Sequence, residues 1–474
     1  MAEESPETRE IDDLRARFEA SGQGHVFGFW SQLDAKGQAQ LAEQAAGLDL
    51  PALLRGFEAT QSPSALPPKL GPPEVEALPE HGGDARARQA ARERGEALLA
   101  DGRVAMMVVA GGQASRLGYP GPKGLFPLGP VSERSLFEIQ AQKLRRLRAR
   151  TGRALPWYVM TSPATDAATR EAFEAADGFG LPPEDLFFFT QAMVPSFDFD
   201  GKLVLERPDR IFQNPDGHGG SLLALHTSGA LDDMERRGID SIFYYQVDNP
   251  LVPMGDPVLM GYHADAGAEV SCTVLRKRHP EEKMGVLARV DGRMGVVEYT
   301  EIDAEHREAR DERGELRFGA GNAAIHAFQV DFVRRMAVDA ERLLPFHASA
   351  KKIPCVDDTG VTRTPDEPNG YKLERFVFDV LPAAERVCVV ESSRDDYSPV
   401  KNASGSDSPE TSRRDLSARY RAWIEAAGLP SPAPGTWIEI DESQIGSPED
   451  LRALSLARIE DAADRILTRP GDPT

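Results

Sequence analysis

Apolar positions follow two different spacings along the chain, and the change falls near residue 100. Before about residue 58 they recur at the three- and four-residue intervals of an amphipathic helix. The positions expected to be buried there are Leu14, Phe18, Phe27, Trp30, Leu33 and Leu41. The proline-rich segment 61–83 cannot continue a helix, and a charged helix is expected at about 84–100. The pattern predicts a helical N-terminal region over residues 1–100 that includes a proline-rich connector.

From residue 103 onward, short apolar runs alternate with helical segments. The runs "RVAMMVVA", "WYVMTS" and "SIFYYQV" precede helices expected at 135–150, near 165–176 and near 256–266. Runs of this length between helices favour a mainly parallel sheet that is buried on both faces. At 286–302 two β-rich runs flank Asp291-Gly292, which is typical of a hairpin, so an antiparallel element is expected at the sheet edge. The fold class predicted is α/β, Rossmann-like, with a mainly parallel mixed sheet and a main domain over 101–390.

The remaining residues, 391–474, are expected to form a small C-terminal subdomain. The pattern predicts helices at 416–429 and 447–467, the second with Ser447 as its N-cap and Asp450 three residues later.

Charge narrows the classes of partner. The 474 residues include 55 Lys and Arg against 76 Asp and Glu, a formal charge of −21. This field repels nucleic acid and anionic membranes, so an anionic ligand needs locally concentrated cations.

Three cysteines without a CxxC pair indicate neither a disulfide framework nor a thiolate zinc site. The acidic N-terminus lacks an apolar stretch, and "VAMMVVA" is far shorter than a membrane span, so a cytoplasmic protein is expected.

The segment "VVAGGQASRLGYPGPKGLFPLG" (108–129) carries the clearest chemistry. Gly111 and Gly112 follow a strand, at the edge where parallel sheets bind ligands, and let the backbone approach a ligand closely. Neither the phosphate-binding P-loop nor the dinucleotide pattern is present. Arg116 and Lys123 add two cations, which suggests a polyphosphate chain along the loop. The alternative is a surface loop with incidental basic residues.

The loop resembles the signature loop of the UTP-dependent sugar-1-phosphate uridylyltransferases. Gln113 and Arg116 make it similar to the eukaryotic-type UDP-N-acetylhexosamine pyrophosphorylases in particular. The resemblance covers about 101–412, in family order, through "FQNPDGHGG", "YYQVDNPLV", "GVVEYTEI", "GAGNAAIH", "PNGYKLERFVFD" and "SPVKNASG". It implies the nucleotide-diphospho-sugar transferase fold. Two positions depart from the family pattern: Ala114, where relatives usually have glycine, and His218, where they commonly have asparagine.

The resemblance also implies roles for individual residues. Nucleotide contacts are expected from Val109, Ala110, Gly111, Gly112, Gln113, Lys123, Gln191, Gly217, Asp248 and Lys372. Sugar contacts are expected from His218, Glu298, Tyr299, Asn322 and Lys401. The catalytic cations are expected to be Arg116, Lys123 and Lys401, with Mg²⁺ (or Mn²⁺) held by Asp248.

Several of these residues have plainer interpretations when they are considered alone. Asp248 at a strand end could equally cap a turn before Pro250, and Lys372 could be a solvated lysine at the start of a helix. Glu298 and Tyr299 could be half-solvated strand residues, and Asn322 a turn asparagine. The basic run 143–153 is expected to form the solvated face of a helix, with Leu144 and Leu147 turned inward. The histidines 263, 326 and 347 show no ligand spacing, and no metal is assigned to them.

The expected reaction is formation of UDP-N-acetylglucosamine and pyrophosphate from UTP and N-acetylglucosamine 1-phosphate. The alternatives are another sugar 1-phosphate (of glucose, galactose or N-acetylgalactosamine) and a non-catalytic nucleotide-sugar sensor. A dinucleotide-binding oxidoreductase lacks its glycine fingerprint. The sequence indicates no oligomeric state.

Overall fold

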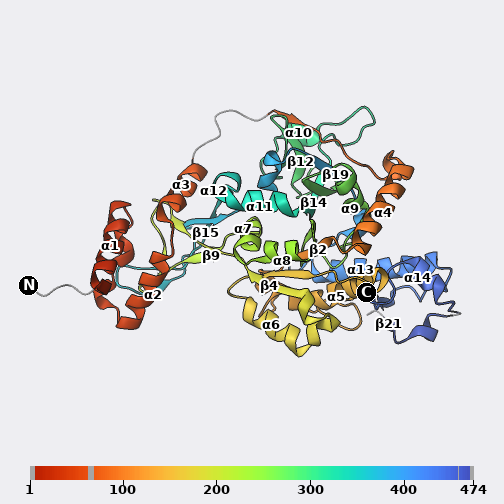
Figure 1. Ribbon diagram of the computed structural model, residues 1–474, viewed down its shortest axis with the longest axis horizontal. Coiled ribbons are helices and arrows are strands. Elements are labelled where there is room, and N and C mark those ends of the chain that lie inside the picture. Colours follow the sequence, from red (N-terminus) through yellow and green to blue (C-terminus); the bar gives the residue numbers. More distant parts are fainter. Residues whose placement is uncertain (1–5, 62–68, 457, 470–474) are drawn as a thin grey trace, which may run out of the picture. The chain divides into compact units, whose positions relative to one another are not determined.

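The computed structural model describes residues 6–61, 69–456 and 458–469 (Figure 1). These residues divide into two compact units, neither of them continuous in sequence. The small unit takes its described residues from 6–61, 191–223 and 338–380, and the sheet unit from 69–190, 224–337 and 381–469. The predicted limits at residues 100 and 390 do not separate these units, and they remain a prediction about subdomains.

The sheet unit is built on one ten-stranded mixed sheet, called the main sheet below. Its central path runs β1-β12-β14-β10-β2-β3-β4, while β11 pairs with β14 and β19, and β13 pairs with β12. The strands are β1 (Leu70–Gly71), β2 (Val104–Val109), β3 (Trp157–Thr161), β4 (Leu186–Thr190), β10 (Ser241–Gln246), β11 (Val270–Arg276), β12 (Val286–Val290), β13 (Arg293–Val297), β14 (Ala320–Gln329) and β19 (Val387–Glu391).

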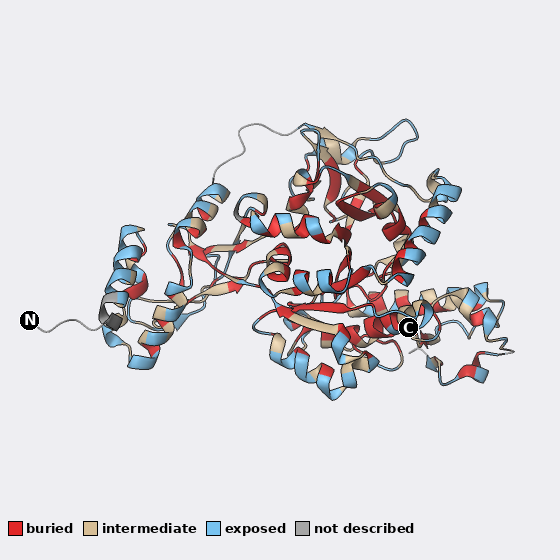
Figure 2. Cartoon of the chain, in the orientation of Figure 1, coloured by how far each residue is buried: buried red, intermediate tan, exposed pale blue. Residues whose placement is uncertain are grey.

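Parallel pairing dominates one side of the main sheet. The strands β10, β2, β3 and β4 run parallel, as do β11 and β19, whereas β14 is antiparallel to β10 and to β11. Side chains of β2, β3 and β10 are buried on both faces, which explains their nearly continuous apolar runs. Figure 2 shows these strands largely in the colour of buried residues, with the exposed residues on the outer sides of helices. The predicted α/β fold with a mixed sheet is confirmed.

The expected hairpin lies where the sequence places it. Strands β12 and β13 pair antiparallel, from Val286 opposite Val297 to Val290 opposite Arg293. The turn residues Asp291 and Gly292 have φ of 50° and 84°. A two-residue turn with both φ values positive matches the twist of the flanking strands, and Asp-Gly is a favoured pair for it.

The sheet unit also contains helices. They are α4 (Ala85–Ala100), α5 (Leu136–Thr151), α6 (Asp166–Ala175), α8 (Ala230–Arg236), α9 (Pro257–Asp265), α10 (Ala304–Glu308), α11 (Val330–Val338), α13 (Pro409–Ala426) and α14 (Pro448–Ala453). Helix α5 begins with a capping box, because Ser135 and Glu138 exchange side-chain and backbone hydrogen bonds. Helices α4 and α9 lie side by side (Figure 1) and approach so closely that a Cβ on Gly95 or Gly261 would overlap the backbone of the other helix. Helix α4 therefore packs with the main sheet, although in sequence it adjoins the N-terminal helices.

The small unit joins N-terminal helices to short strands. Its helices are α1 (Pro6–Ala20), α2 (Ala35–Ala46), α3 (Leu50–Gln61) and α12 (Ala340–Leu343), and α7 (Gly220–Thr227) crosses from this unit into the sheet unit along the chain. Its strands are β5 (Met193–Pro195), β6 (Phe197–Asp198), β7 (Leu205–Arg207), β8 (Arg210–Ile211), β9 (Gln213–Pro215), β15 (His347–Lys351), β16 (Cys355–Val356), β17 (Thr362–Arg363) and β18 (Gly370–Glu374). Of the six predicted buried positions, Phe18, Phe27 and Leu41 are buried in its core, and Leu14, Trp30 and Leu33 pack against that core partly exposed.

The end of the chain differs from the predicted helix over 447–467. Ser447 does cap a helix, since its side chain accepts from Asp450 N–H, but α14 ends at Ala453. Residues Ile466–Arg469 instead form β21, which pairs antiparallel with β20 (Trp437–Ile440) and buries Ile466. Strand pairing across the chain outweighs helical spacing here, a contact that the local pattern cannot reveal. Among the described residues, no helix is both long and apolar enough to cross a membrane.

Candidate active site

The glycine-rich loop after β2 is closed by backbone hydrogen bonds. Ala110 N–H donates to Met160 O at 2.8 Å, which extends the pairing of β2 with β3 beyond Val109. Lys123 N–H donates to Gly112 O at 2.9 Å and so joins the two ends of the loop. A Cβ on Gly112 would meet no described atom within 4 Å, so packing against the protein does not require a glycine there.

Arg116 and Ala114 lie in the turn between those ends. Arg116 is exposed in a short 3₁₀ helix, Ser115–Leu117. Ala114 is buried with φ −93° and ψ 22°, which is ordinary for an L-residue, whereas Gly118 takes the left-handed conformation at φ 72°. Alanine at position 114, where the family pattern usually has glycine, is therefore unstrained. Gln113 is exposed and forms an isolated bridge with Pro122.

Asp248 lies beside this loop because β2 and β10 are parallel neighbours. Gln246 at the end of β10 is opposite Val109 at the end of β2, so the following residues reach the same sheet edge. The Lys123 Nζ and Asp248 Oδ2 atoms are 3.7 Å apart, and both side chains are largely buried. The structure therefore brings together the predicted cation and the predicted metal ligand.

Lys401 joins the same cluster through the segment after β19. Val400 N–H donates to Asp248 O at 2.9 Å, and Lys401 Nζ donates to Tyr397 Oη at 3.2 Å. Desolvation of the ammonium works against its charged form, but Tyr397 and the Asp248 carboxylate outweigh this and raise the pKa of Lys401. Two cations thus flank one carboxylate at the carboxyl ends of β2 and β10.

The predicted sugar-binding residues of the sheet unit share a second location. Asn322 on β14 donates its backbone N–H to Gly285 O at 2.8 Å, and a Cβ on Gly285 would lie 3.0 Å from Glu298 Oε1. Glu298 and Asn322 are therefore gathered around Gly285. Tyr299, one residue beyond, is 43% exposed. Ala324 N–H donates to Asn322 Oδ1, so the amide fixes the local backbone, but Asn322 lies on a strand and not in a turn as the plainer interpretation expected.

In the small unit, Gln191 and Gly217 are placed opposite each other. Met193 of β5 pairs with Pro215 of β9, and Asp216 N–H donates to Ala192 O at 3.1 Å. If the same register continues by one residue beyond Ala192 and Asp216, Gln191 lies opposite Gly217. The two residues expected to contact the base are thus neighbours, although 26 positions separate them in the sequence.

Gly217 occupies a position that only glycine fits. Its φ is +86°, and an added Cβ would lie 2.5 Å from Arg375 O and 2.9 Å from Arg375 N. Gly219 N–H donates to Arg375 O at 2.8 Å, and Arg375 N–H donates to Asp216 O at 2.7 Å. The glycine turn over 216–220 is therefore packed directly against the backbone that follows β18.

His218 in this turn is a neutral imidazole. Val377 N–H donates to His218 Nδ1 at 3.1 Å, and the ring stacks on Phe376 with centroids 5.4 Å apart. Burial, with a smaller effect of His347, lowers the pKa of His218 to about 4. Because Nδ1 accepts a hydrogen bond, the proton of the neutral ring is on Nε2. The side chain can therefore donate one hydrogen bond, as an asparagine amide can.

Lys372 does not begin a helix as expected. It lies on β18, opposite Ser349 of β15, and its Nζ is 5.0 Å from the ring centroid of Phe212. Burial lowers its pKa. Residues 373–377 have helical spacing of apolar side chains, but strand pairing with β15 and β6 overrides that local pattern. The lysine is half-buried over an aromatic ring, which excludes the plain solvated interpretation.

Sequence reasoning missed two residues of the sheet-unit cluster. Ser162 Oγ donates to Gly111 O at 2.8 Å and fixes the carbonyl at the entrance of the glycine-rich loop. Ser162 directly follows β3, so the rule that pointed to residues after β2 and β10 would have found it. Tyr397 contacts Lys401, but it lies in an irregular segment where no spacing rule operates.

The donor set near Asp248 fits a hard divalent cation shared with a ligand. Among the described residues, no group of three or more His, Cys, Asp or Glu side chains is arranged to hold a metal ion. Mg²⁺ commonly uses one or two carboxylates and completes its shell with phosphate oxygens and water. A single buried carboxylate flanked by two lysines matches this arrangement, since the lysines leave room for anions rather than for further acidic ligands.

Comparison with known proteins agrees with this geometry. The family model of UTP–glucose-1-phosphate uridylyltransferase matches residues 72–407. Human UDP-N-acetylhexosamine pyrophosphorylase-like protein 1 is 38% identical over 445 residues, covering 90% of this chain and 88% of the relative. Saccharomyces cerevisiae UDP-N-acetylglucosamine pyrophosphorylase is 36% identical, with 88% of this chain and 92% of the relative covered. The crystal structure of the Trypanosoma brucei uridine diphosphate N-acetylglucosamine pyrophosphorylase superposes with a TM-score of 0.76 at 28% identity, covering 90% of this chain and 88% of that one.

A mixed α/β sheet with a glycine-rich loop and a lysine–aspartate–lysine cluster at its carboxyl edge defines a nucleotidyltransferase-type protein. The chain belongs to the UTP–glucose-1-phosphate uridylyltransferase family.

Proposed function

We propose that the chain transfers the uridylyl group of UTP to N-acetylglucosamine 1-phosphate and releases pyrophosphate. The cluster of Lys123, Asp248 and Lys401 carries this proposal, because it concentrates cations beside one buried carboxylate in a strongly acidic protein. The choice of N-acetylglucosamine rests on relatives named for it, among them the yeast enzyme.

The reaction needs no nucleophilic side chain. The sugar phosphate oxygen is already ionised near neutral pH, so it can attack the α-phosphorus of UTP in line as pyrophosphate leaves. The work left to the protein is positioning the two substrates and neutralising their combined negative charge. Arg116, Lys123 and Lys401 are the cations proposed for this role, with Lys372 at a phosphate of the nucleotide.

Asp248 is the residue that would hold Mg²⁺ or Mn²⁺. A bound divalent cation supplies charge neutralisation and orientation of phosphate oxygens. The chain's own part is to hold the carboxylate in place, and Lys123 Nζ, 3.7 Å from Asp248 Oδ2, puts a positive charge beside it.

The glycine turn of the small unit is proposed to bind the uracil and the sugar. The Gln191 amide offers a donor and an acceptor together, as a uracil edge requires, and Gly217 lies beside it in the glycine turn that packs against the Arg375 backbone. His218, neutral with its proton on Nε2, donates one hydrogen bond to the sugar. The sugar is also proposed to contact three residues of the sheet unit, which accept hydrogen bonds from its hydroxyl groups or pack against its ring: Glu298, Tyr299 and Asn322. A cytoplasmic location is part of the same proposal.

The test is pyrophosphate release from Mg-UTP with a panel of sugar 1-phosphates. N-acetylglucosamine 1-phosphate is expected to give the highest kcat/KM, and Lys123→Met serves as the inactive control. Preference for glucose, galactose or N-acetylgalactosamine 1-phosphate would change the assigned substrate but keep the uridylyltransferase reaction. Binding of UTP without release of pyrophosphate from any sugar would identify a nucleotide-sugar sensor and refute the proposal.

A further inference from the structure

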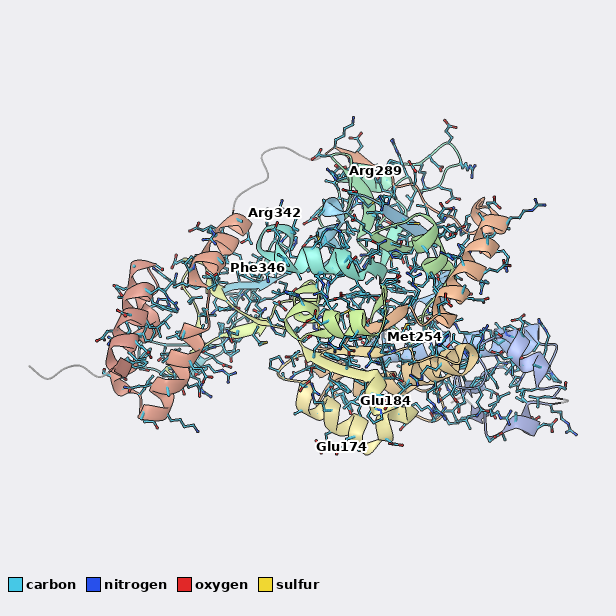
Figure 3. All side chains as sticks on the ribbon, in the orientation of Figure 1. Glu174, Glu184, Met254, Arg289, Arg342 and Phe346 are labelled. Carbon is cyan, nitrogen blue, oxygen red and sulfur yellow. The ribbon has the colours of Figure 1, made fainter. Side chains whose placement is uncertain are left out.

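The loop that follows β10 is buried although it has no regular structure. Residues 247–252 are all buried, and Met254, labelled in Figure 3, marks the chain just beyond them. Buried carbonyl groups that lack secondary-structure partners need other donors, because an unpaired buried acceptor is costly. In this loop Asp248 O accepts from the backbone N–H of Val400, and four other carbonyls accept from side chains.

Three side chains from two helices hold four carbonyls of the loop. From α5, Gln140 Nε2 donates to Val247 O at 2.9 Å, on the N-terminal side of Asp248. Also from α5, Lys143 Nζ donates to the carbonyls of residues 250 and 252, the second at 3.1 Å. From α13, Arg419 Nη1 donates to Leu251 O at 3.1 Å. The peptide groups on both sides of the Asp248 carboxylate are thus fixed by this set of donors.

Lys143 is the unusual member, because it was expected on the solvated face of α5. It is 2% exposed, and Glu442 Oε1 lies 3.7 Å from its Nζ. Tyr420 Oη donates to the same Glu442 oxygen at 2.9 Å. Burial lowers the pKa of Lys143 to about 8, against the effect of Glu442, so the ammonium is still mainly protonated near pH 7. The expectation of a solvated lysine is wrong because the loop and Glu442 surround it.

Such a group is costly to bury and is not explained by packing alone. Removing an ammonium and a carboxylate from water is unfavourable unless excellent geometry compensates, and apolar residues of equal volume often stabilise a fold equally well. An apolar side chain at 143 would fill the space, but it would leave two loop carbonyls without their donor. A charged donor is therefore buried at position 143 because the loop carbonyls need its hydrogen bonds.

We infer that Lys143 is a positioning residue for Asp248, and that Glu442 makes the C-terminal segment part of the active-site support. This inference rests on the proposed function in one respect, namely that Asp248 binds the metal of a metal–UTP complex. The opposite side of the loop is also tied: Asn249 Oδ1 accepts from Ser398 N–H at 3.1 Å, and Asn249 Nδ2 donates to Asp396 O at 2.9 Å. A loop displaced by loss of Lys143 would thus disturb the segment that leads to Lys401.

The experiment compares the parent chain with Lys143→Met, the double variant Lys143→Met/Glu442→Gln, and Arg150→Met as the control. Arg150 is an exposed residue on the same helix. Binding of Mn²⁺ in the presence of UTP is measured by electron paramagnetic resonance, with thermal unfolding and pyrophosphate release recorded for each protein. Loss of a residue that supports a metal ligand typically weakens metal binding on the order of 10- to 100-fold.

Lys143→Met is expected to weaken Mn²⁺ binding by that factor and to lower the unfolding temperature, since Glu442 loses its countercharge. The double variant removes both charges, so its unfolding temperature should recover while Mn²⁺ binding stays weak. Arg150→Met should match the parent in all three measurements.

Two results would overturn the inference: unchanged Mn²⁺ binding in Lys143→Met, or binding that recovers together with stability in the double variant. Failure of the proposed function looks different. In that case the parent releases no pyrophosphate with any sugar 1-phosphate, while Mn²⁺ binding with UTP is still weaker in both Lys143 variants. A parent chain that binds no Mn²⁺ with UTP would overturn both.

Discussion

The substitution Gly217→Ala tests how strictly the glycine turn depends on its backbone. Gly217 has φ +86°, and a Cβ there would lie 2.5 Å from Arg375 O. Gly229, in the sheet unit, is the control for left-handed backbone alone, since its φ is +77° but a Cβ would meet nothing within 4 Å. Both substitutions force alanine into a left-handed conformation, and only the first also drives it into another segment's backbone.

The expected magnitudes follow from those two differences. Left-handed backbone costs an L-residue about 1–2 kcal/mol, and the stiffer unfolded chain returns about 0.4–1 kcal/mol. Gly229→Ala should therefore cost about 1 kcal/mol of unfolding free energy. Overpacking against fixed backbone adds about 1–3 kcal/mol, so Gly217→Ala should cost about 2–4 kcal/mol. A domain of about 150–250 residues loses about 2–4 °C of Tm for each kcal/mol, so the two substitutions are compared by their unfolding free energies as well as by Tm.

Thermal unfolding and steady-state kinetics together test whether the contact of Gly217 with Arg375 supports UTP binding. Gly217→Ala should lower Tm more than Gly229→Ala does and should raise the KM for UTP on the order of 10-fold, because displacing the turn displaces a proposed uracil contact. Gly229→Ala should leave that KM unchanged. Equal losses of Tm in the two variants, with KM unchanged in both, would refute the role assigned to the contact with Arg375.

Four further substitutions test other parts of the site. Arg116→Ala and Lys401→Ala should each reduce turnover on the order of 10²-fold if these cations stabilise developing charge, and near-parent pyrophosphate release in both would exclude them as catalytic residues. The pKa of His218 is lowered from 6.5 to about 4, so the unfolded chain binds more protons between those values and stability falls as pH decreases through that window. Between pH 7 and pH 5 the parent should lose about 2 kcal/mol that His218→Asn keeps, measured by denaturant unfolding, and parallel losses would contradict the neutral assignment. Ala114→Gly should cost about 0.5–1 kcal/mol with no gain in UTP binding, since Ala114 already has φ −93°; tighter binding would show that the alanine strains the loop.

Local patterns predicted most elements of the sheet unit correctly. The helices at 135–150, 165–176 and 256–266 and the Asp291-Gly292 hairpin all lie at or within a few residues of their expected positions. These segments carry strong local signals, such as the Ser135 capping box and apolar runs buried on both faces. Ser447 was likewise a correct helix cap.

The errors share one physical cause, which is contact between segments distant in sequence. Lys372 lies on a strand rather than a helix because its strand, β18, pairs with β15 and β6. The last predicted helix stops at Ala453 because residues 466–469 pair with β20. Lys143 is buried because a loop more than 100 positions away supplies its acceptors.

The sequence by itself determined the chemistry of the candidate site: paired glycines, Arg116, Lys123, Asp248 and Lys401 in the order of a uridylyltransferase family. It did so because these residue types follow strands whose carboxyl ends meet at one edge of a parallel sheet. Only the tertiary structure decided which of them meet, such as Lys123 Nζ at 3.7 Å from Asp248 Oδ2. It also decided that His218 is neutral, since burial and the Val377 N–H set its protonation and tautomer, and neither can be deduced from spacing along the chain.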